Sequence, residues 1–331
     1  MSQTMKALYN VPGPEGAIPQ WREVPIPTPG VGEVLVRIHA SAINRGELIR
    51  RPELRLDNPN AKPGRGGTEF GGEIAAVGAG VSQWKVGDRV MARAHGCYAP
   101  FTVVDQRALM AIPAGLSWVA AAAIPNVFIT AHDALVSNAR LAAGEAVMIT
   151  AGSSGVGTAA IQIARCLEAH PVLATTRSAA KSEALRSLGA DQVINTTEPG
   201  WTEAVLKATG GRGVDVIIDH VGGSMLPDNI KALAIKGRLV SVGRNDSKVG
   251  PCDLDEVARK RISIIGVTFR TRSAEEALQC SQRFAEQMLG EFERGRMHPV
   301  VDRTFAFEQI NDAHAYMLGN AQVGKIVLTM D

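Results

Sequence analysis

Short runs of alternating apolar and polar residues fill the first part of the chain, and glycine and proline interrupt them. Residues 33–40 alternate in part, as the residues of a half-buried strand do. Strand-like runs also occupy residues 71–78, 87–92 and 98–104, and glycines mark several of the turns between them. We therefore predict that residues 1–123 form a β-rich, barrel-like domain with few helices.

The pattern changes after Pro125, where short continuous apolar runs alternate with stretches of helical periodicity. Apolar residues between 156 and 167 recur at three- and four-residue steps and predict a helix, and residues 178–188 and 202–209 also have helical patterns. Six strands with intervening helices predict a doubly wound parallel sheet, and hence an α/β protein. The predicted strands are 145–150, 172–175, 192–195, 214–219, 238–242 and 262–268.

Helical periodicity returns at residues 273–294, and an extended segment follows at residues 299–307. A further helix is predicted to run through Met317, and residues 324–330 have the pattern of a last strand. The end of the chain is therefore predicted to supply one long helix, a second helix and a last strand.

A glycine cluster lies between the first strand of the predicted sheet and its helix. It contains Gly155-x-Gly157-x-x-Ala160, one form of the dinucleotide-binding fingerprint. Gly155 is predicted to permit the tight turn, and Gly157 to let a pyrophosphate approach the backbone, where the helix N-terminus offers unpaired N–H groups. A glycine turn that binds no ligand is the alternative. The predicted cofactor contacts here are Gly152, Ser153, Ser154, Gly155, Val156 and Gly157.

The residues about 20 positions further on bear on the choice of cofactor. A site selective for NAD places Asp or Glu there, whereas this chain has Thr176, Arg177 and, one turn later, Lys181. No carboxylate is present to repel a 2′-phosphate, and the Arg177 guanidinium can pair with one. The pattern favours NADPH as the cofactor. The alternative is an exposed arginine and lysine that only solvate the start of a helix.

Composition and charge exclude several classes of partner. The chain has 331 residues, roughly two domains' worth. A net charge of +2 and 5% aromatic residues argue against a nucleic-acid partner. The most apolar stretch, residues 118–131, contains Pro125 and falls short of the ~20 residues of a membrane helix, so no membrane association is expected. Four cysteines without a CxxC pair, and no signal-peptide pattern, predict a cytoplasmic protein with free thiols.

Several motifs in a fixed order resemble the medium-chain dehydrogenase/reductase superfamily, and most of all its zinc-independent NADPH:quinone oxidoreductases, the group that includes zeta-crystallin. The C-terminal part, residues 269–328, is similar to the p53-inducible quinone oxidoreductase branch. The resemblance implies a GroES-like catalytic domain, residues 1–123 and 272–331, built around a Rossmann cofactor domain, residues 124–271. The motifs are Ala42-Ile43-Asn44-Arg45, Gly67-Thr68-Glu69-Phe70-Gly71-Gly72-Glu73, Val86-Gly87-Asp88-Arg89-Val90, Gly152-x-x-Gly155-Val156-Gly157 and Asp219-His220-Val221-Gly222-Gly223.

The same resemblance implies roles for single residues. Asn44 is expected to face the nicotinamide and the substrate, and Thr130 to lie near the nicotinamide side, so both are candidate catalytic residues. For Asn44 the alternative is a bond to the backbone of its own turn. A homodimer formed through the sixth strand, near residues 262–267, is also expected. Further cofactor contacts are expected at Asn195, Val221, Gly243, Phe269, Arg270, Asn320 and Lys325.

Zinc is not expected. In zinc-dependent relatives a cysteine would stand near the position of Asn44 and a histidine near that of Thr68, and the four cysteines are too dispersed for a structural site. Without a metal the acceptor is expected to be electrophilic already, and the resemblance implies an enzyme that transfers hydride from NADPH to a quinone. Reduction of the activated C=C bond of an enal or enone is the first alternative, because the chain has no tyrosine between Tyr9 and Tyr98 to line a site for flat quinones. A non-catalytic, crystallin-like NADPH-binding protein is the second.

Overall fold

The computed structural model describes residues 3–48 and 54–330, and the chain divides into two compact units. The first unit comprises Met1–Asn126, Ser281–Glu293 and Pro299–Asp331, and the second comprises Val127–Cys280 and Arg294–His298. The predicted boundaries lay at 123/124 and 271/272. The units instead divide within two helices, α3 (Pro125–His132) and α9 (Ala274–Met288), so each of these helices contributes residues to both units.

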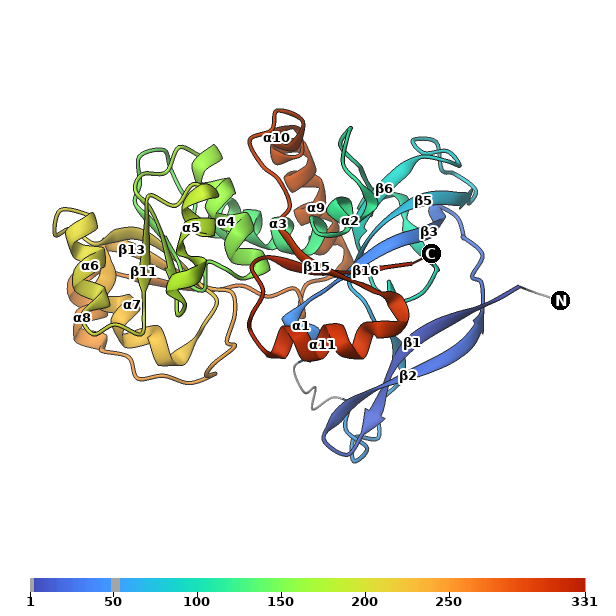
Figure 1. The fold of residues 1–331 in the computed structure, drawn as a ribbon, viewed down its shortest axis with the longest axis horizontal. Coiled ribbons are helices and arrows are strands. Elements are labelled where there is room, and N and C mark those ends of the chain that lie inside the picture. Colours follow the sequence, from blue (N-terminus) through green and yellow to red (C-terminus); the bar gives the residue numbers. More distant parts are fainter. Residues whose placement is uncertain (1–2, 49–53, 331) are drawn as a thin grey trace. The chain divides into compact units, whose positions relative to one another are not determined.

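Strands from both ends of the described chain form the sheets of the first unit (Figure 1). β16 pairs antiparallel with β3, with Ile326 opposite Ile43, so the last strand lies beside the one that leads to Asn44. A three-stranded sheet has the order β2-β1-β4, and a seven-stranded sheet has the order β15-β16-β3-β5-β6-β8 with β7 paired to β3. The strands are β1 (Thr4–Gly13), β2 (Gly16–Pro25), β3 (Glu33–Ile43), β4 (Gly64–Arg65), β5 (Glu69–Val77), β6 (Arg89–Arg93), β7 (Phe101–Asp105), β8 (Met110–Ala111), β15 (Val301–Ala306) and β16 (Lys325–Thr329).

Small side chains let a helix pack closely on this sheet. Ala40, Ala42 and Val327 on the strands meet Ala122 and Ala123 at the end of α2, and all five side chains are fully buried. A Cβ at Gly71 would lie 2.8 Å from the carbonyl oxygen of Trp118, so β5 needs a glycine where α2 crosses it. The shorter helices of the first unit are α1 (Arg45–Leu48), α2 (Trp118–Ala122), α10 (Gly290–Glu293) and α11 (Ile310–Leu318), with 3₁₀ turns at Gln106–Ala108 and Phe307–Gln309.

The second unit contains one six-stranded sheet, in the order β11-β10-β9-β12-β13-β14, and every neighbouring pair is parallel. With β9 counted as the first strand, this is the 3-2-1-4-5-6 order of doubly wound dinucleotide-binding sheets. The predicted α/β fold class is therefore confirmed. The strands are β9 (Val147–Ile149), β10 (Val172–Thr176), β11 (Gln192–Asn195), β12 (Val214–Asp219), β13 (Leu233–Ser241) and β14 (Ser263–Gly266).

The connections between these strands are helical. α7 and α8 lie in stretches where the sequence pattern predicted no helix, whereas α4, α5 and α6 overlap predicted ones. No helix in the described ranges is both long and apolar enough to cross a membrane. The helices are α4 (Gly155–Cys166), α5 (Ser182–Ser187), α6 (Trp201–Ala208), α7 (Leu226–Ala232) and α8 (Leu254–Lys260), with a π-helical turn η3 (Asp133–Asn138) and 3₁₀ turns at Ala179–Lys181 and Gly223–Met225.

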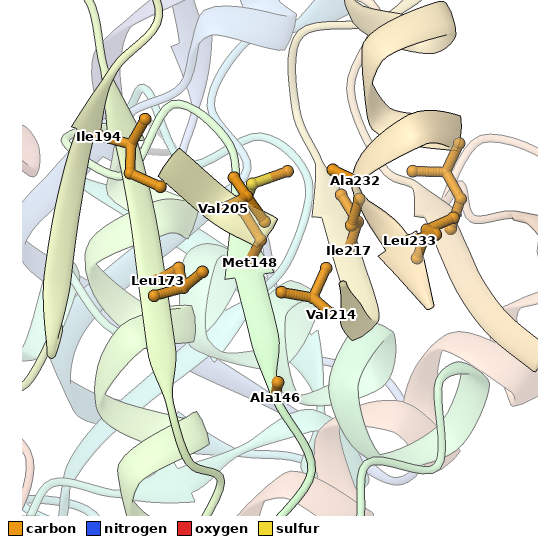
Figure 2. Close-up of a cluster of buried hydrophobic side chains, with 10 residues drawn as sticks. Ala146, Met148, Leu173, Ile194, Val205, Val214, Ile217, Ala232 and Leu233 are labelled. Carbon is orange, nitrogen blue, oxygen red and sulfur yellow. The ribbon is translucent and has the colours of Figure 1, made fainter. Parts of the chain in front are cut away.

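A core of branched and unbranched aliphatic side chains fills the space between the sheet and the helices on one face. Met148 and Ile217 come from neighbouring central strands, and Val205 reaches them from α6 (Figure 2). Burying each of these side chains contributes on the order of 2 kcal/mol. The remaining members of the cluster are Ala146, Leu173, Ile194, Val214, Ala232, Leu233 and Leu239. This packing fixes the position of the sheet, and the candidate cofactor-binding residues of this unit lie at or after the carboxyl ends of its strands.

Candidate active site

The loop between β9 and α4 has the geometry of a phosphate-binding turn. Ser154 is the N-cap of α4, and its hydroxyl accepts a hydrogen bond of 3.0 Å from the N–H of Gly157. The positive φ of the loop, 48°, falls at Ala151 rather than at Gly155, which is the first residue of the helix. The residue that accommodates the tight turn is therefore Ala151, and the role predicted for Gly155 is not observed.

Gly157 is required for close packing of the helix against its own loop. A Cβ there would lie 2.6 Å from the carbonyl oxygens of both Ala151 and Gly152. Within the described part of the chain, the N–H groups of Gly155 and Val156 have no hydrogen-bond acceptor, as expected in the first turn of a helix. They can donate to an anion at the positive end of the helix, so this loop fits the phosphates of a dinucleotide.

The ends of β10 and β11 bring the predicted ribose-side residues together. Thr176 and Asn195 are register partners at the carboxyl ends of these parallel strands. Thr176 is buried and its hydroxyl accepts from the N–H of Ser178 at 3.1 Å. Arg177 is exposed, and among the described residues its guanidinium has neither a hydrogen bond nor an ion pair. Lys181 follows in the 3₁₀ turn. Arg177 is therefore a cation that no described residue pairs with, directly after β10.

The end of β12 carries a buried carboxylate that organises the next loop. Asp219 accepts from the Thr150 hydroxyl at 2.9 Å and from the N–H groups of Val221 and Gly222, each at 3.0 Å. Burial raises the pKa of Asp219, and these hydrogen bonds oppose the rise. They fix the backbone of Val221, which was predicted to contact the cofactor.

Gly243, another predicted contact, packs against the same loop. A Cβ at Gly243 would lie 2.7 Å from the carbonyl oxygen of His220, so only glycine fits. Its N–H donates to the carbonyl oxygen of Asp219 at 3.0 Å. The observed reason for a glycine is thus contact between two loops at the carboxyl edge of the sheet. Contact with the nicotinamide ring stays a prediction.

The remaining predicted residues of the second unit are Thr130, Phe269 and Arg270. Thr130 is half-buried on α3. Phe269 and Arg270 lie in the segment that follows β14, where the Arg272 guanidinium lies over the Phe269 ring at 4.7 Å from its centroid. The side chain of Arg270 is exposed, and its N–H donates to the Thr268 hydroxyl at 3.2 Å.

In the first unit, Asn44 lies at the centre of a polar network directly after β3. Its amide nitrogen donates to Glu69 Oε1 at 2.8 Å and to the Thr68 hydroxyl at 3.1 Å. Its amide oxygen accepts from Lys325 Nζ at 2.6 Å and from Asn126 Nδ2 at 2.8 Å. The alternative bond to its own turn, to the Ala42 carbonyl, is long at 3.4 Å. The amide nitrogen also lies 3.3 Å from Glu47 Oε1, so five side chains hold Asn44 in one orientation.

Lys325 forms a buried ion pair in this network. Its side chain is 4% exposed and that of Glu69 is fully buried, and Nζ lies 2.8 Å from Glu69 Oε1. The ammonium also donates to the Ile43 carbonyl at 2.8 Å and to Asn44, so all three N–H bonds are used. Lys325 was predicted to contact the cofactor. That contact stays a prediction, and the structure shows instead a lysine that orients Asn44.

A second carboxylate, Glu47, extends the network. Glu47 lies on α1, three residues after Asn44, and accepts from the hydroxyls of Thr68 and Tyr98. Loss of solvent raises the pKa of Glu47, and it raises the pKa of Tyr98 well above its usual value. Glu47, Glu69 and Tyr98 are site residues that the sequence did not reveal. The only signal was that Glu69 stands beside Thr68 in one of the motifs.

Asn320 lies near this site at the end of α11, with a left-handed φ of 57°. Its side-chain oxygen accepts from Arg45 Nη2 at 2.8 Å, and the same nitrogen donates to the Met317 carbonyl at 2.8 Å. Arg45 follows Asn44 in the chain, so two predicted site residues, Asn44 and Asn320, are joined through it.

No group of three or more His, Cys, Asp or Glu side chains within residues 3–48 and 54–330 is arranged to hold a metal ion. All four cysteines are free, and burial raises the pKa of the Cys97 thiol well above its usual value. Cys97 is therefore a thiol that does not ionise readily.

Two family models match the chain, one within the first unit and one mostly within the second. Residues 30–115 match the alcohol dehydrogenase GroES-like domain, and residues 155–284 match the model described as zinc-binding dehydrogenase. The chain belongs to the medium-chain dehydrogenase/reductase superfamily, whose Rossmann-type unit binds nicotinamide dinucleotides.

The proteins similar to this chain include a quinone oxidoreductase and a polyketide synthase protein. The quinone oxidoreductase of Rattus norvegicus is 32% identical over 98% of this chain and 96% of its own length. The spectinabilin polyketide synthase system protein NorB of Streptomyces orinoci is 34% identical over 99% of this chain, which spans only 14% of NorB. Among solved structures, the JamJ enoyl reductase is 31% identical, with a TM-score of 0.82 over 99% of this chain and 100% of that one.

Proposed function

We propose that this protein is an NADPH-dependent oxidoreductase that transfers hydride to a quinone without zinc. The observation that carries the proposal is the network around Asn44. At the positions where the superfamily resemblance puts a cysteine and a histidine in zinc-dependent relatives, this chain has Asn44 and Thr68, hydrogen-bonded to each other at 3.1 Å. An amide and a hydroxyl are not usual zinc ligands, and the charged groups beside them, Glu69 and Lys325, already pair with each other.

Such a site suits an acceptor that is already electrophilic. Bound NADPH supplies a hydride, and a quinone delocalises the resulting charge over its own carbonyl groups. The protein then has to orient the acceptor and exclude competing reactions. Asn44, held by Lys325 and Glu69, is the residue to which we assign this orientation.

The preference for NADPH over NADH is supported by the end of β10. Arg177 is exposed there, and none of the described residues pairs with it, so its guanidinium can meet a 2′-phosphate. The register partners Thr176 and Asn195 are uncharged, and the nearby Glu198 carboxylate accepts from Asn195 Nδ2 at 3.0 Å.

A second candidate function is reduction of the activated C=C bond of an enal or enone. The likeness to the JamJ enoyl reductase and to a polyketide synthase protein favours it. The same hydride donor and the same orientation of the acceptor by Asn44 would serve either reaction.

The test is NADPH oxidation with matched panels of quinones, enals and enones, followed by identification of the products. Hydroquinone as the main product supports the proposal, whereas saturated carbonyl products favour the second candidate. Asn44→Ala is expected to lower kcat with either panel, because the oriented amide is lost. Tight NADPH binding with no turnover on either panel contradicts both and favours a non-catalytic binding protein.

We also propose that the protein is a cytoplasmic homodimer. The exposed edge of the six-stranded sheet supports the dimer, because residues Ser263, Ile264 and Gly266 on β14 are exposed and Ile264 is 49% exposed. Free thiols at all four cysteines are those expected of a reducing compartment.

A further inference from the structure

An ion pair with a buried carboxylate joins two distant segments of the second unit. Arg272 Nη2 lies 2.6 Å from Asp133 Oδ2, and Nη1 lies 3.2 Å from Oδ1, so the pair is bidentate. The side chain of Asp133 is 3% exposed and that of Arg272 is 20% exposed. A bidentate pair fixes the direction as well as the position of the guanidinium.

Both members of the pair are held by further contacts. Asp133 begins the π-helical turn η3, and Asn138 at the end of that turn donates to Asp133 Oδ2 at 3.1 Å and to its carbonyl oxygen at 2.8 Å. Arg272 also donates to the Cys280 sulfur from its Nη1. π-helical turns are rare and occur frequently at functional sites.

The guanidinium of Arg272 in turn supports Phe269. It lies over the ring at 4.7 Å from the centroid, a cation–π contact. Directly after Arg272 the chain is fixed by a reciprocal cap, in which Ser273 Oγ accepts from the N–H of Glu276 at 3.2 Å while the Glu276 carboxylate accepts from the N–H of Ser273 at 2.7 Å. Before Phe269, the N–H of Val267 donates to the Ser241 carbonyl at 3.0 Å. Residues 268–271 therefore lie between two fixed points, the backbone of Val267 and the cap at Ser273.

This segment lies at the edge of the sheet where a dinucleotide is expected. It follows β14, and the carboxyl ends of all six parallel strands, including those before Ala151 and Val221, meet at one edge. Ligands of doubly wound sheets bind at that edge. Between the two fixed points, the N–H of Arg270 donates to Thr268 Oγ1 at 3.2 Å.

We infer that Asp133 and Arg272 are positioning residues for the cofactor: they hold Phe269 and Arg270 in the conformation that binds a nicotinamide dinucleotide. The inference rests on the proposed function, because it takes NADPH as the ligand. Neither residue needs to touch the cofactor. A segment that is ordered before binding loses less conformational entropy on binding, and so the pair increases affinity.

The test measures the Kd for NADPH by fluorescence titration in three variants of the full chain. Arg272→Lys keeps the positive charge but loses the bidentate pairing with Asp133 and the planar guanidinium that lies over the Phe269 ring. Phe269→Leu keeps the ion pair but removes the aromatic ring. Each is expected to raise the Kd about tenfold, because side chains and a segment that must be ordered on binding reduce the affinity by roughly this factor. Arg259→Lys is the matched control, because Arg259 also forms a bidentate pair, with Glu256 on α8, at 2.8 and 2.6 Å. Its Kd is expected to equal that of the wild type.

A second readout separates positioning from loss of fold. The apparent Kd equals the Kd of the folded protein divided by the folded fraction, so urea unfolding of each variant supplies the correction. Amide hydrogen exchange should quicken in residues 267–272 of Arg272→Lys but not in β12. Wild-type Kd values in both Arg272→Lys and Phe269→Leu would overturn the inference and leave the proposed function standing. Failure of the wild type itself to bind NADPH or NADH would overturn the proposed function, and this inference with it.

Discussion

At the scale of the residue, Arg177 gives the sharpest prediction about the cofactor. Arg177→Glu places a carboxylate where a 2′-phosphate would bind, so the Kd for NADPH should rise at least about tenfold while the Kd for NADH changes little or falls. Titrations with both cofactors measure this. Lys207→Glu, on an exposed position of α6, is the control for net charge. An unchanged NADPH/NADH preference in Arg177→Glu would exclude the assignment.

His220 gives a prediction about pH. Burial lowers its pKa to about 4, and Nδ1 lies 3.0 Å from the Thr150 carbonyl, so the neutral ring is a donor there. The unfolded chain binds this proton near pH 6.5 and the folded chain only near pH 4. Stability from this group is therefore full above pH 6.5 and is lost as pH falls toward 4, by about 3 kcal/mol.

The measurement is urea unfolding of the wild type and His220→Gln between pH 7 and pH 4. Between pH 7 and pH 4 the free energy of unfolding of His220→Gln should fall less than that of the wild type, by about 3 kcal/mol. His170→Gln, at a side chain that is 72% exposed, is the control. Parallel curves for the wild type and His220→Gln would contradict the prediction.

At the scale of the element, β16 contributes one side of the buried ion pair. Lys325→Met leaves Glu69 buried without its cation and should cost about 3–5 kcal/mol in the free energy of unfolding. Combining it with Glu69→Gln removes both charges, so the double variant should lose less than the sum of the single losses. Lys85→Met, which breaks an exposed pair with Asp88, should cost under about 1 kcal/mol. Additive losses at 69 and 325 would show that the two side chains do not interact.

The elements also show what the sequence could and could not predict. Arg177 and Asn195 were located correctly at strand ends, because short apolar runs mark where β10 and β11 end. The pairing of Lys325 with Glu69 could not be found in this way, since the two are 256 residues apart and are joined only by the register of β16 and β5 on either side of β3. α7 was missed because it has only seven residues and a proline in its first turn.

At the scale of the whole molecule, the open edge of β14 predicts the oligomeric state. Ile264→Lys places a charge on the proposed dimer contact and should convert the dimer into a monomer, as measured by light scattering. Leu254→Lys alters a side chain of the same unit that is 73% exposed but lies outside the sheet edge, and should leave the dimer intact. A wild type that is monomeric at all concentrations would rule out the proposed interface.

The pairing of β16 with β3 also affects how the protein is made. Glu69 and Asn44 leave the ribosome early, but their cation, Lys325, is translated more than 250 residues later. During synthesis the nascent first unit must therefore keep Glu69 hydrated or protonated, and Asn44 lacks one of its partners. The second unit, almost entirely one continuous stretch, has no such delay. The cofactor-binding fold can thus form during translation, whereas the network around Asn44 is completed only after residues 325–329 emerge.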